Sequence, residues 1–442
     1  MSIISQGGSQ PAVTGAPNIS GSGDQSNHFA FAAMTSLFFI WGFITALNDI
    51  LIPQLKAAFS LNYTQAMLVQ FCFFGAYFLV SPLAGKLIER IGYIKGIMVG
   101  LATIALGCLL FYPAAEISVY ALFLFGLFIL ASGVTILQVS ANPYVAILGE
   151  EETAASRLSL AQAINSLGHT LAPLFGAALI FSATADLSAS AEVAGQTADA
   201  KSVQLPYLIL AGVTLLTAAG FYFLKLPLLT PPVAAASPTQ QLLTAESSIW
   251  QQKGLLLGVL AIFLYVGAEV SIGSFLVNYL ALEHIGGLSE KQASTMVAYY
   301  WGGAMIGRFI GALLTRYISA SYVLLSNALI AILLLFVTMN STGMVAVWSV
   351  IAIGFFNSIM FPTIFTMAIR GLGPLTSRGS GLLCQAIVGG AILPLLQGLV
   401  ADSVGVQLSF IVPVLAYGYI AGYAWYSTRQ QHRVSALSQV SL

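Results

Sequence analysis

The sequence predicts an all-α membrane protein with twelve transmembrane helices arranged as two pseudo-symmetric six-helix bundles. The 442-residue chain is 58% hydrophobic and only 7% charged, whereas soluble domains average about 25% charged residues. About twelve apolar stretches are each long enough to cross a bilayer, which takes about 20 residues. A polar, proline-rich segment divides these stretches into six and six, and short motifs recur in the corresponding stretches of each half.

The apolar stretches follow one another along the chain with polar connections between them. The first half holds the spans 29–55, 66–88, 93–113, 117–148, 157–182 and 205–226. The second half holds the spans 254–282, 292–315, 321–339, 343–369, 378–401 and 407–427. The segment between the halves contains Pro-Pro and Ser-Pro steps, which are typical of a linker. We therefore expect an N-terminal bundle at 29–226, a cytoplasmic linker at 227–252 and a C-terminal bundle at 253–427.

The ends of the chain and its basic residues predict the orientation. Residues 1–28 are rich in Gly and Ser and contain no Lys or Arg, so they lack the basic region of a signal peptide. We expect 1–28 to be a disordered cytoplasmic tail, and 428–442 to be a second cytoplasmic tail. With the N-terminus inside, the Lys and Arg residues near span ends divide roughly eleven to three in favour of the cytoplasm. Both termini are therefore predicted to be cytoplasmic.

Short motifs recur in corresponding spans of the two halves. The recurring pairs are Gly85 to Arg90 with Gly311 to Arg316, Gln138 and Pro143 with Asn357 and Pro362, and Gln162-Ala-Ile with Gln385-Ala-Ile. Three matches in corresponding spans indicate two parallel six-helix repeats. Such repeats place a substrate site at their interface near the middle of the membrane.

Several motifs resemble those of one transporter family. The segment Gly85 to Gly92 resembles the loop between the second and third helices of the major facilitator superfamily. The motifs that narrow the resemblance are Leu47-Asn-Asp-Ile-Leu-Ile-Pro-Gln54, Gln70-Phe-Cys-Phe-Phe-Gly-Ala-Tyr-Phe78, Ala141-Asn-Pro-Tyr144, Ala161 to Gly168 and Tyr265 to Gly273. Together they resemble the bacterial fucose–galactose–glucose cation symporters, and most closely the glucose/galactose branch. The resemblance covers most of residues 30–427. It implies a multi-pass importer of monosaccharides in the bacterial inner membrane, driven by a proton or sodium gradient.

Two carboxylates lie inside apolar spans, Asp49 in the first and Glu269 near the centre of the seventh. An ionisable group at this depth costs roughly 2.5–3.5 kcal/mol on insertion scales and is a functional candidate by default. We expect Asp49 and Glu269 to handle the coupling cation or its linkage to sugar binding. Each has an alternative: Asp49 could bond a helix end near Pro53, and Glu269 could pair with Arg308 without taking part in transport.

The chain departs from the fucose–proton symporter at Gln138 and at Glu269. That protein carries a glutamate in its fourth helix where this chain has Gln138, and a glutamine in its seventh helix where this chain has Glu269. Asp49 is retained. The coupling mechanism and the sugar preference therefore cannot be copied from the fucose transporter.

The resemblance also implies a gate at the cytoplasmic face. Gly85 permits close approach of helices, and the Glu89 and Arg90 charges can form a contact between the bundles. Arg308 and Arg316 are the gating candidates of the second half. The alternative is that these charges only set the topology.

Amide side chains are the predicted sugar contacts, because sugar hydroxyls both donate and accept, as Asn and Gln do. The candidates are Gln138, Asn142, Gln162, Asn165, Asn357 and Gln385. We rank Gln162 and Asn165 first, since they share a helix face and belong to a family motif. The alternative for each amide is a hydrogen bond between helices. His169 lies on the same face and is expected to be a packed histidine.

Aromatic side chains can stack on the apolar faces of sugar rings. The candidates are Phe38, Trp41, Tyr265, Tyr299, Tyr300 and Trp301. Because 11% of the chain is aromatic, the default for each is packing against lipid or core. Trp41 stands out because it shares a helix face with Thr45 and Asn48, with Asp49 nearby. Trp41 and Asn48 are therefore added to the predicted substrate site.

No sequence feature indicates an enzyme or a resident cofactor. A Walker-type phosphate loop is absent, so ATP is not expected to drive the protein directly. The three cysteines are scattered in apolar stretches, which predicts neither disulfides nor a metal site. The expected partners are a monosaccharide and the lipid bilayer, with no nucleic acid, and a monomer suffices if the site lies between the halves. N-acetylglucosamine or fucose transport, drug export and non-transporting sugar sensing stay open as alternatives.

Overall fold

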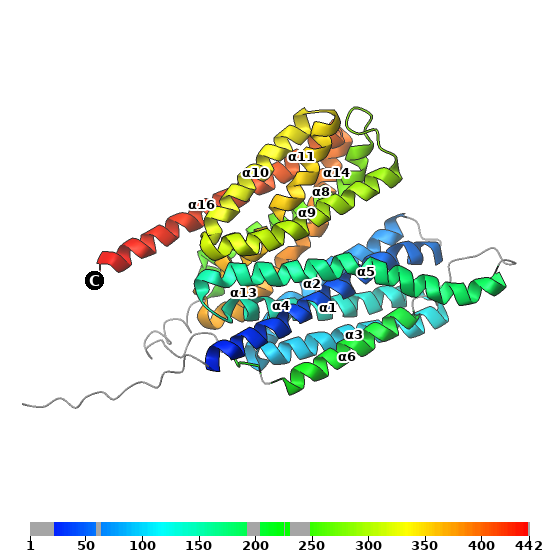
Figure 1. The fold of residues 1–442 in the computed structure, drawn as a ribbon, viewed down its shortest axis with the longest axis horizontal. Coiled ribbons are helices and arrows are strands. Elements are labelled where there is room, and N and C mark those ends of the chain that lie inside the picture. Colours follow the sequence, from blue (N-terminus) through cyan, green and yellow to red (C-terminus); the bar gives the residue numbers. More distant parts are fainter. Residues whose placement is uncertain (1–21, 59–62, 192–203, 225, 230–247, 441–442) are drawn as a thin grey trace, which may run out of the picture.

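The computed structural model is all-helical in the part of the chain that it describes, which is residues 22–58, 63–191, 204–224, 226–229 and 248–440. The N-terminal half contributes α1 (Ser22–Ala58), α2 (Tyr63–Ile91), α3 (Tyr93–Ile117), α4 (Tyr120–Ile147), α5 (Ala154–Ala191) and α6 (Gln204–Phe223). These helices form the lower bundle in Figure 1. Each corresponds to one predicted span of the first half.

The C-terminal half forms the upper bundle in Figure 1. Its long helices are α8 (Lys253–Ala281), α9 (Glu290–Tyr317), α10 (Ala320–Asn340) and α16 (Ile411–Val440). The remaining two spans are each built from two helices, α11 (Gly343–Asn357) with α12 (Met360–Ile369), and α13 (Thr376–Gln385) with α14 (Gly389–Val404). The fold therefore has six spans in each half, as the sequence predicts.

Two outer boundaries differ from the predicted ones. The first helix, α1, begins at Ser22, inside the segment 1–28 that was expected to be a tail. The last helix, α16, continues to Val440, beyond the expected end of the bundle at residue 427. The difference arises because an apolar run marks only the part of a helix that lies in hydrocarbon, whereas backbone hydrogen bonds can continue the helix past it.

Ten segments in the described residues are long and apolar enough to cross a membrane by length and composition. The two spans outside this set are α5 and α9. The sequence of α9 contains four charged residues, among them Arg308 and Arg316. A transmembrane helix tolerates such residues when they face the bundle interior rather than lipid. The least apolar spans are therefore the ones to inspect for a functional site.

Among the prolines inside the described spans, Pro82, Pro143 and Pro362 each free a backbone carbonyl that a side chain of another helix then binds. A proline has no N–H and its ring crowds the carbonyl four residues before it, so that carbonyl loses its helical partner. Each freed carbonyl instead accepts a bond from a side chain of another helix. The pairs are Gln385 Nε2 to Phe78 O before Pro82 (3.1 Å), Ser380 Oγ to Val139 O before Pro143 (3.0 Å), and Arg308 Nε to Ser358 O before Pro362 (3.2 Å). Two of these bonds, those from α13 to α2 and α4, join the two bundles.

Candidate functional site

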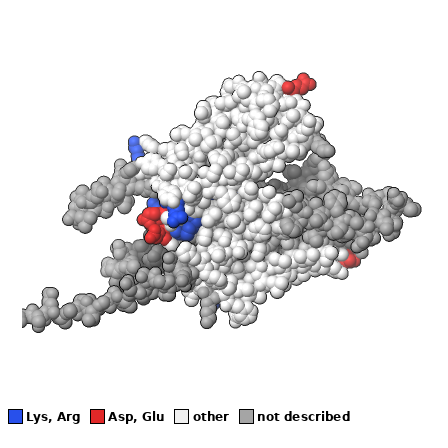
Figure 2. Space-filling view, in the orientation of Figure 1, with Lys and Arg blue, Asp and Glu red and all other residues white. Residues whose placement is uncertain are grey.

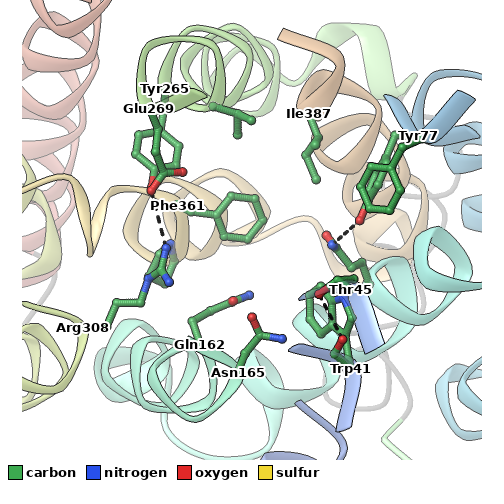
Figure 3. Close-up of a pocket in the computed structure, with 14 residues that line it drawn as sticks. Trp41, Thr45, Tyr77, Gln162, Asn165, Tyr265, Glu269, Arg308, Phe361 and Ile387 are labelled. Carbon is green, nitrogen blue, oxygen red and sulfur yellow. Dashed lines mark hydrogen bonds and ion pairs between the residues drawn. The ribbon is translucent and has the colours of Figure 1, made fainter. Parts of the chain in front are cut away.

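A central pocket of 240 Å³ lies between the two bundles. Its lining from the N-terminal bundle is Trp41, Thr45, Phe73, Tyr77, Gln138, Gln162 and Asn165. Its lining from the C-terminal bundle is Tyr265, Val266, Glu269, Arg308, Phe361, Pro362 and Ile387. Pockets for drug-sized ligands take about 300–1,000 Å³, so the central pocket suits a smaller molecule. Figure 3 shows the polar groups of both bundles facing this space.

The N-terminal side of the pocket is built on the contact between α1 and α5. Asn165 Nδ2 donates to the backbone oxygen of Phe38 at 2.9 Å, which fixes the amide beside α1. Gly42 makes this contact possible, because a β-carbon there would come within 2.0 Å of the Asn165 oxygen. The close approach brings Trp41 and Asn165, which come from different helices, to the same wall of the pocket.

Two further amides lie on this side. Gln138 on α4 donates through Nε2 to the Tyr77 hydroxyl at 2.6 Å, so its nitrogen is already engaged. Gln162 lies 3.4 Å from Asn142 Oδ1, a long hydrogen bond that leaves most of its amide available. Gln162 therefore offers the freest amide on the wall that the N-terminal bundle provides, whereas the nitrogens of Gln138 and Asn165 each donate a short hydrogen bond.

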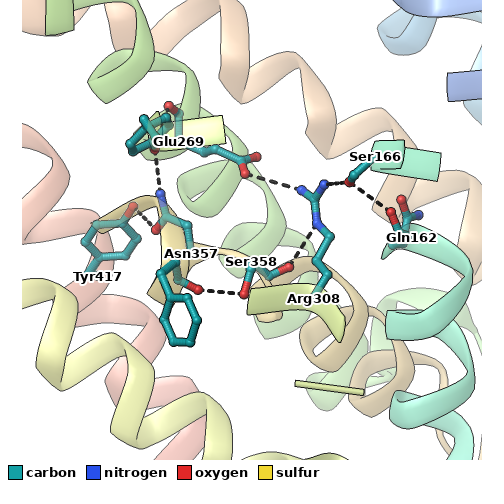
Figure 4. Close-up of polar contacts among 9 residues, drawn as sticks. Gln162, Ser166, Glu269, Arg308, Asn357, Ser358 and Tyr417 are labelled. Atoms are coloured by element: carbon teal, nitrogen blue, oxygen red, sulfur yellow. Dashed lines mark hydrogen bonds and ion pairs between the residues drawn. The ribbon is translucent and has the colours of Figure 1, made fainter. Parts of the chain in front are cut away.

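On the opposite wall, Glu269 of α8 forms an ion pair with Arg308 of α9. The distance from Glu269 Oε1 to Arg308 Nη2 is 3.5 Å. Arg308 also donates through Nη1 to the Ser166 hydroxyl of α5, so the guanidinium connects the two bundles. Figure 4 shows these contacts together with the third one, from Nε to the Ser358 carbonyl that Pro362 frees. The pair that the sequence offered as an alternative for Glu269 is present in the structure.

Three of the predicted sugar-binding amides do not line the pocket. Asn357 is fully buried within the C-terminal bundle, where it donates to the Tyr300 hydroxyl at 2.8 Å and accepts from the Tyr417 hydroxyl. Gln385 donates to the carbonyl of Phe78 instead of facing the pocket. Asn142 is buried behind Gln162. In each case a neighbouring helix contributes a hydrogen-bond partner to the amide.

The remaining sequence candidates divide between the pocket and other places. Among the aromatic ones, Trp41 and Tyr265 line the pocket. Tyr299 and Trp301 are partly exposed and do not line the pocket. The side chains of Asn48 and Asp49 lie outside the described residues, although α1 itself passes through both positions.

Two aromatic candidates and one histidine have other positions. Phe38 and Tyr300 are fully buried and serve as packing and as a hydrogen-bond partner. His169 was expected to be packed; its side chain is accessible at the surface, although it keeps an interaction within the structure. Gly168 just before it packs against Phe39 of α1, and successive residues on a helix point about 100° apart. His169 is thereby turned away from that contact.

Several pocket residues escaped the sequence analysis, namely Phe73, Tyr77, Val266, Phe361, Pro362 and Ile387. Most of them lie in segments that were singled out for other residues. Tyr77 belongs to the motif that starts at Gln70, and Ile387 ends the Gln385-Ala-Ile motif. A search for aromatic or apolar residues beside each proposed polar contact would have found them.

One end of the molecule is closed by contacts between the bundles. Glu89 of α2 forms an ion pair with Arg378 of α13 at 2.7 Å. Glu151, just before α5, forms a second one with Arg370, just after α12, at 2.5 Å. We call this end, which carries both ion pairs, the closed end. The predicted contact of Glu89 between the bundles is thus confirmed, and its partner is Arg378.

The other gating candidates have different surroundings. Arg90 is exposed and lies outside the Glu89 ion pair. Arg316 is exposed near the Tyr317 ring, 6.0 Å from its centre. Arg308 lies in the central pocket rather than at the closed end. Only Glu89 of the predicted charges therefore joins the two bundles at the closed end in the described structure.

Glycines bring α2 and α13 together at the closed end. A β-carbon at Gly85 would come within 2.9 Å of the Ser377 oxygen, and one at Gly381 within 2.8 Å of the Ser81 oxygen. Both distances are shorter than real β-carbons show, and both involve backbone atoms. The prediction that Gly85 permits close helix approach is confirmed.

Charged side chains are distributed unevenly along the molecule. On the face shown in Figure 2, the Lys and Arg side chains lie toward the left, and the right end shows only acidic ones. The closed end, where α13 begins with Arg378 near its start, lies at this same side (Figure 1). The broad middle of this face carries no charge among the described residues, as a lipid-facing surface requires.

Comparison with known proteins gives consistent results. A family model described as "Major Facilitator Superfamily" matches residues 29–383. A glucose/galactose transporter of Brucella abortus is 58% identical over 90% of this chain and 94% of the relative. A putative glucose/galactose transporter of Helicobacter pylori is 46% identical over 92% of this chain and 98% of the relative. An L-fucose-proton symporter of Escherichia coli is 36% identical over 88% of this chain and 91% of the relative.

The fold is also similar to solved structures. A crystal structure of the transporter FucP in the outward conformation matches with a TM-score of 0.81 and 36% sequence identity. The match covers 91% of this chain and 99% of that chain. The fold of this chain is therefore shared with an experimentally determined transporter.

Proposed function

Because the chain belongs to the major facilitator superfamily, we propose that it is a secondary active importer that moves a hexose, such as glucose or galactose, together with a proton or a sodium ion. The observation that carries the proposal is the central pocket, in which amides of one bundle face an ion pair of the other. Sugar hydroxyls donate and accept hydrogen bonds, so both walls are suited to them. The names of the relatives, glucose/galactose transporter and L-fucose-proton symporter, support the same substrate class.

The proposed transport cycle follows from the two-bundle architecture. The bundles rock about the central pocket and expose it to one side of the membrane at a time. Lys and Arg are enriched on the cytoplasmic side of membrane proteins, so we assign the closed end, with its basic residues, to the cytoplasm. The structure then corresponds to the state in which the pocket is closed toward the cytoplasm. Both termini would be cytoplasmic, and the protein would reside in the bacterial inner membrane.

We assign cation coupling to Asp49, the acid on α1. It belongs to the motif shared with the cation symporters, and the same helix places Trp41 and Thr45 in the central pocket. Cation binding at Asp49 would thus occur on a helix that also contacts the sugar. For symport, cation and sugar must favour the same conformational exchange, because a return with only one of them bound would dissipate the gradient. Both walls of the pocket come from one chain, so a monomer suffices.

Uptake into proteoliposomes tests the proposal. Radiolabelled glucose, galactose, fucose and N-acetylglucosamine are offered under an imposed proton or sodium gradient, with Asp49→Asn beside the wild-type protein. We expect one gradient to concentrate a hexose, and the Asp49 variant to lose accumulation while it retains sugar exchange. Accumulation of N-acetylglucosamine alone would replace the hexose as the proposed substrate. Saturable sugar binding without accumulation under either gradient would indicate a sensor and would refute the importer.

A further inference from the structure

The wall of the central pocket that belongs to α8 contains two buried polar atoms that make no hydrogen bond of normal geometry among the described residues. Tyr265 and Glu269 are four residues apart on α8, so both side chains lie on one helix face. Both residues are buried and line the pocket. The Tyr265 hydroxyl and the Glu269 carboxylate interact with each other, and Glu269 Oε1 also faces Arg308 at 3.5 Å, but neither the hydroxyl nor Oε1 makes a hydrogen bond of normal geometry among the described residues. Buried polar atoms are nearly always hydrogen-bonded, so this wall is suited to a ligand that brings hydrogen-bonding groups of its own.

The charge of Glu269 is already compensated. Arg308 Nη2 lies 3.5 Å from Glu269 Oε1, a distance at which the ions attract each other without a good hydrogen bond. Two other contacts hold the guanidinium, one to Ser166 and one to the carbonyl of Ser358. A sodium ion or a proton that binds at Glu269 would have to approach this fixed positive charge. The Glu269 position is therefore poorly suited to the coupling cation and well suited to a neutral ligand.

We infer that Glu269 and Arg308 form the part of the sugar site that the C-terminal bundle provides, and that Glu269 determines specificity by accepting a hydrogen bond from one sugar hydroxyl. The inference deepens the proposed hexose transport and rests on it. A carboxylate only accepts and a guanidinium only donates, so the pair can bind two neighbouring hydroxyls in opposite senses. Hydrogen bonds to charged groups are stronger than those between neutral groups. A missing or inverted hydroxyl should therefore weaken sugar binding strongly at this position.

The arrangement also explains how one sugar could contact both bundles. Gln162 and Asn165 face the pocket from α5, and Glu269 and Arg308 face it from the other side (Figure 3). Arg308 is itself bonded to Ser166 of α5. A sugar that accepts hydrogen bonds from Arg308 therefore competes directly with the Arg308–Ser166 contact between the bundles.

The test is a thermodynamic cycle in which one protein side chain and one sugar hydroxyl are removed separately and together. Affinities for the preferred hexose and its four monodeoxy analogues (2-, 3-, 4- and 6-deoxy) are measured by calorimetry in nanodiscs, for the wild-type protein, Glu269→Gln and Tyr265→Phe. We expect one deoxy analogue to bind the wild-type protein at least about tenfold more weakly than the parent hexose. In Glu269→Gln, this ratio should fall severalfold toward one, while the ratios for the other three analogues stay unchanged. Glu283→Gln, an exposed acid beyond the end of α8, is the matched control and should keep all four ratios.

Coupling is measured on the same variants. We expect Glu269→Gln to keep the wild-type ratio of cation to sugar, because the cation is assigned elsewhere. The inference is overturned if Glu269→Gln weakens the hexose and all four analogues by the same factor, or leaves every affinity intact and abolishes cation-driven accumulation. If the wild-type protein binds no hexose at all, the proposed function fails and this inference fails with it. Monodisperse elution of each variant verifies folding, and Tyr265→Phe, which deletes one oxygen, provides a second reading if Glu269→Gln does not fold.

Discussion

Packing at the closed end should hold the two bundles together more strongly than the ion pairs do. Gly381→Ala tests this, because the new β-carbon would come within 2.8 Å of the Ser81 oxygen and 3.3 Å of the Gly85 α-carbon. Both are backbone atoms, so neither can rotate away. Overpacking of this kind costs about 1–3 kcal/mol. The cost falls only on the state in which α2 and α13 touch, so the equilibrium should shift toward separation by roughly 5- to 150-fold.

The comparison variant is Arg378→Ala, which breaks the ion pair with Glu89. The side chains of Arg378 and Glu89 are 46% and 32% exposed. Exposed pairs contribute about 0.2–1 kcal/mol, which corresponds to less than about a fivefold shift in the same equilibrium. The ranking of the two variants therefore depends on whether buried backbone contact or charge dominates.

Spin-label distance measurements can rank them. Nitroxides are placed at Lys95 and Tyr317, exposed residues on α3 and α9, after replacement of the native cysteines. Gly381→Ala should increase the population of long distances much more than Arg378→Ala does. Gly212→Ala on α6 is the control, because a β-carbon there would meet no atom within 4 Å. A larger shift in Arg378→Ala than in Gly381→Ala would refute the reasoning.

Three further predictions concern single side chains. Asn357→Ala should lower the stability of the protein by about 1–2 kcal/mol through the loss of bonds to two tyrosines, yet leave sugar affinity unchanged; thermal unfolding and calorimetry check the two parts. Asn165→Ala should weaken sugar binding severalfold and also loosen α1 against α5, so its thermal midpoint should fall, whereas Gln162→Ala should weaken binding with little loss of stability. Trp41→Phe should retain more sugar affinity than Trp41→Ala if the ring packs against the sugar; equal losses in the two variants would contradict that role.

Much of the fold follows from hydropathy alone. Each apolar run of sufficient length must form a helix, because the membrane leaves no other way to pair the backbone. The composition therefore predicts the spans, and the repeated motifs predict two halves. Hydropathy does not predict that the spans around Pro362 and before α14 are each divided into two helices. A proline shows where a helix can break, but whether it breaks depends on the partners that other helices offer to the freed carbonyl.

The site was predicted less completely than the fold, for a physical reason. Hydropathy and helix spacing show that an amide such as Asn357 or Gln385 lies within an apolar helix, but not which neighbour it bonds. Asn357 is satisfied by Tyr300 and Tyr417, and Gln385 by the carbonyl of Phe78. Gln162 and Asn165 line the pocket, where their helix face and their family motif had placed them first. The Glu269 pairing with Arg308 could be foreseen as one of two alternatives, because two opposite charges in apolar helices have few other partners.

The carbonyls freed by Pro82 and Pro143 have a consequence for the movement between states. Each accepts a side-chain bond from α13, across the interface of the bundles. When the bundles separate at this end, both carbonyls lose the side chains that donate to them. Water can then donate the hydrogen bonds instead. Separation of the bundles at the closed end is then also a wetting transition, because the interface must fill with water. Osmolytes that are excluded from protein surfaces should favour the dry, closed arrangement, and the opening equilibrium should depend on osmotic pressure as well as on sugar and cation.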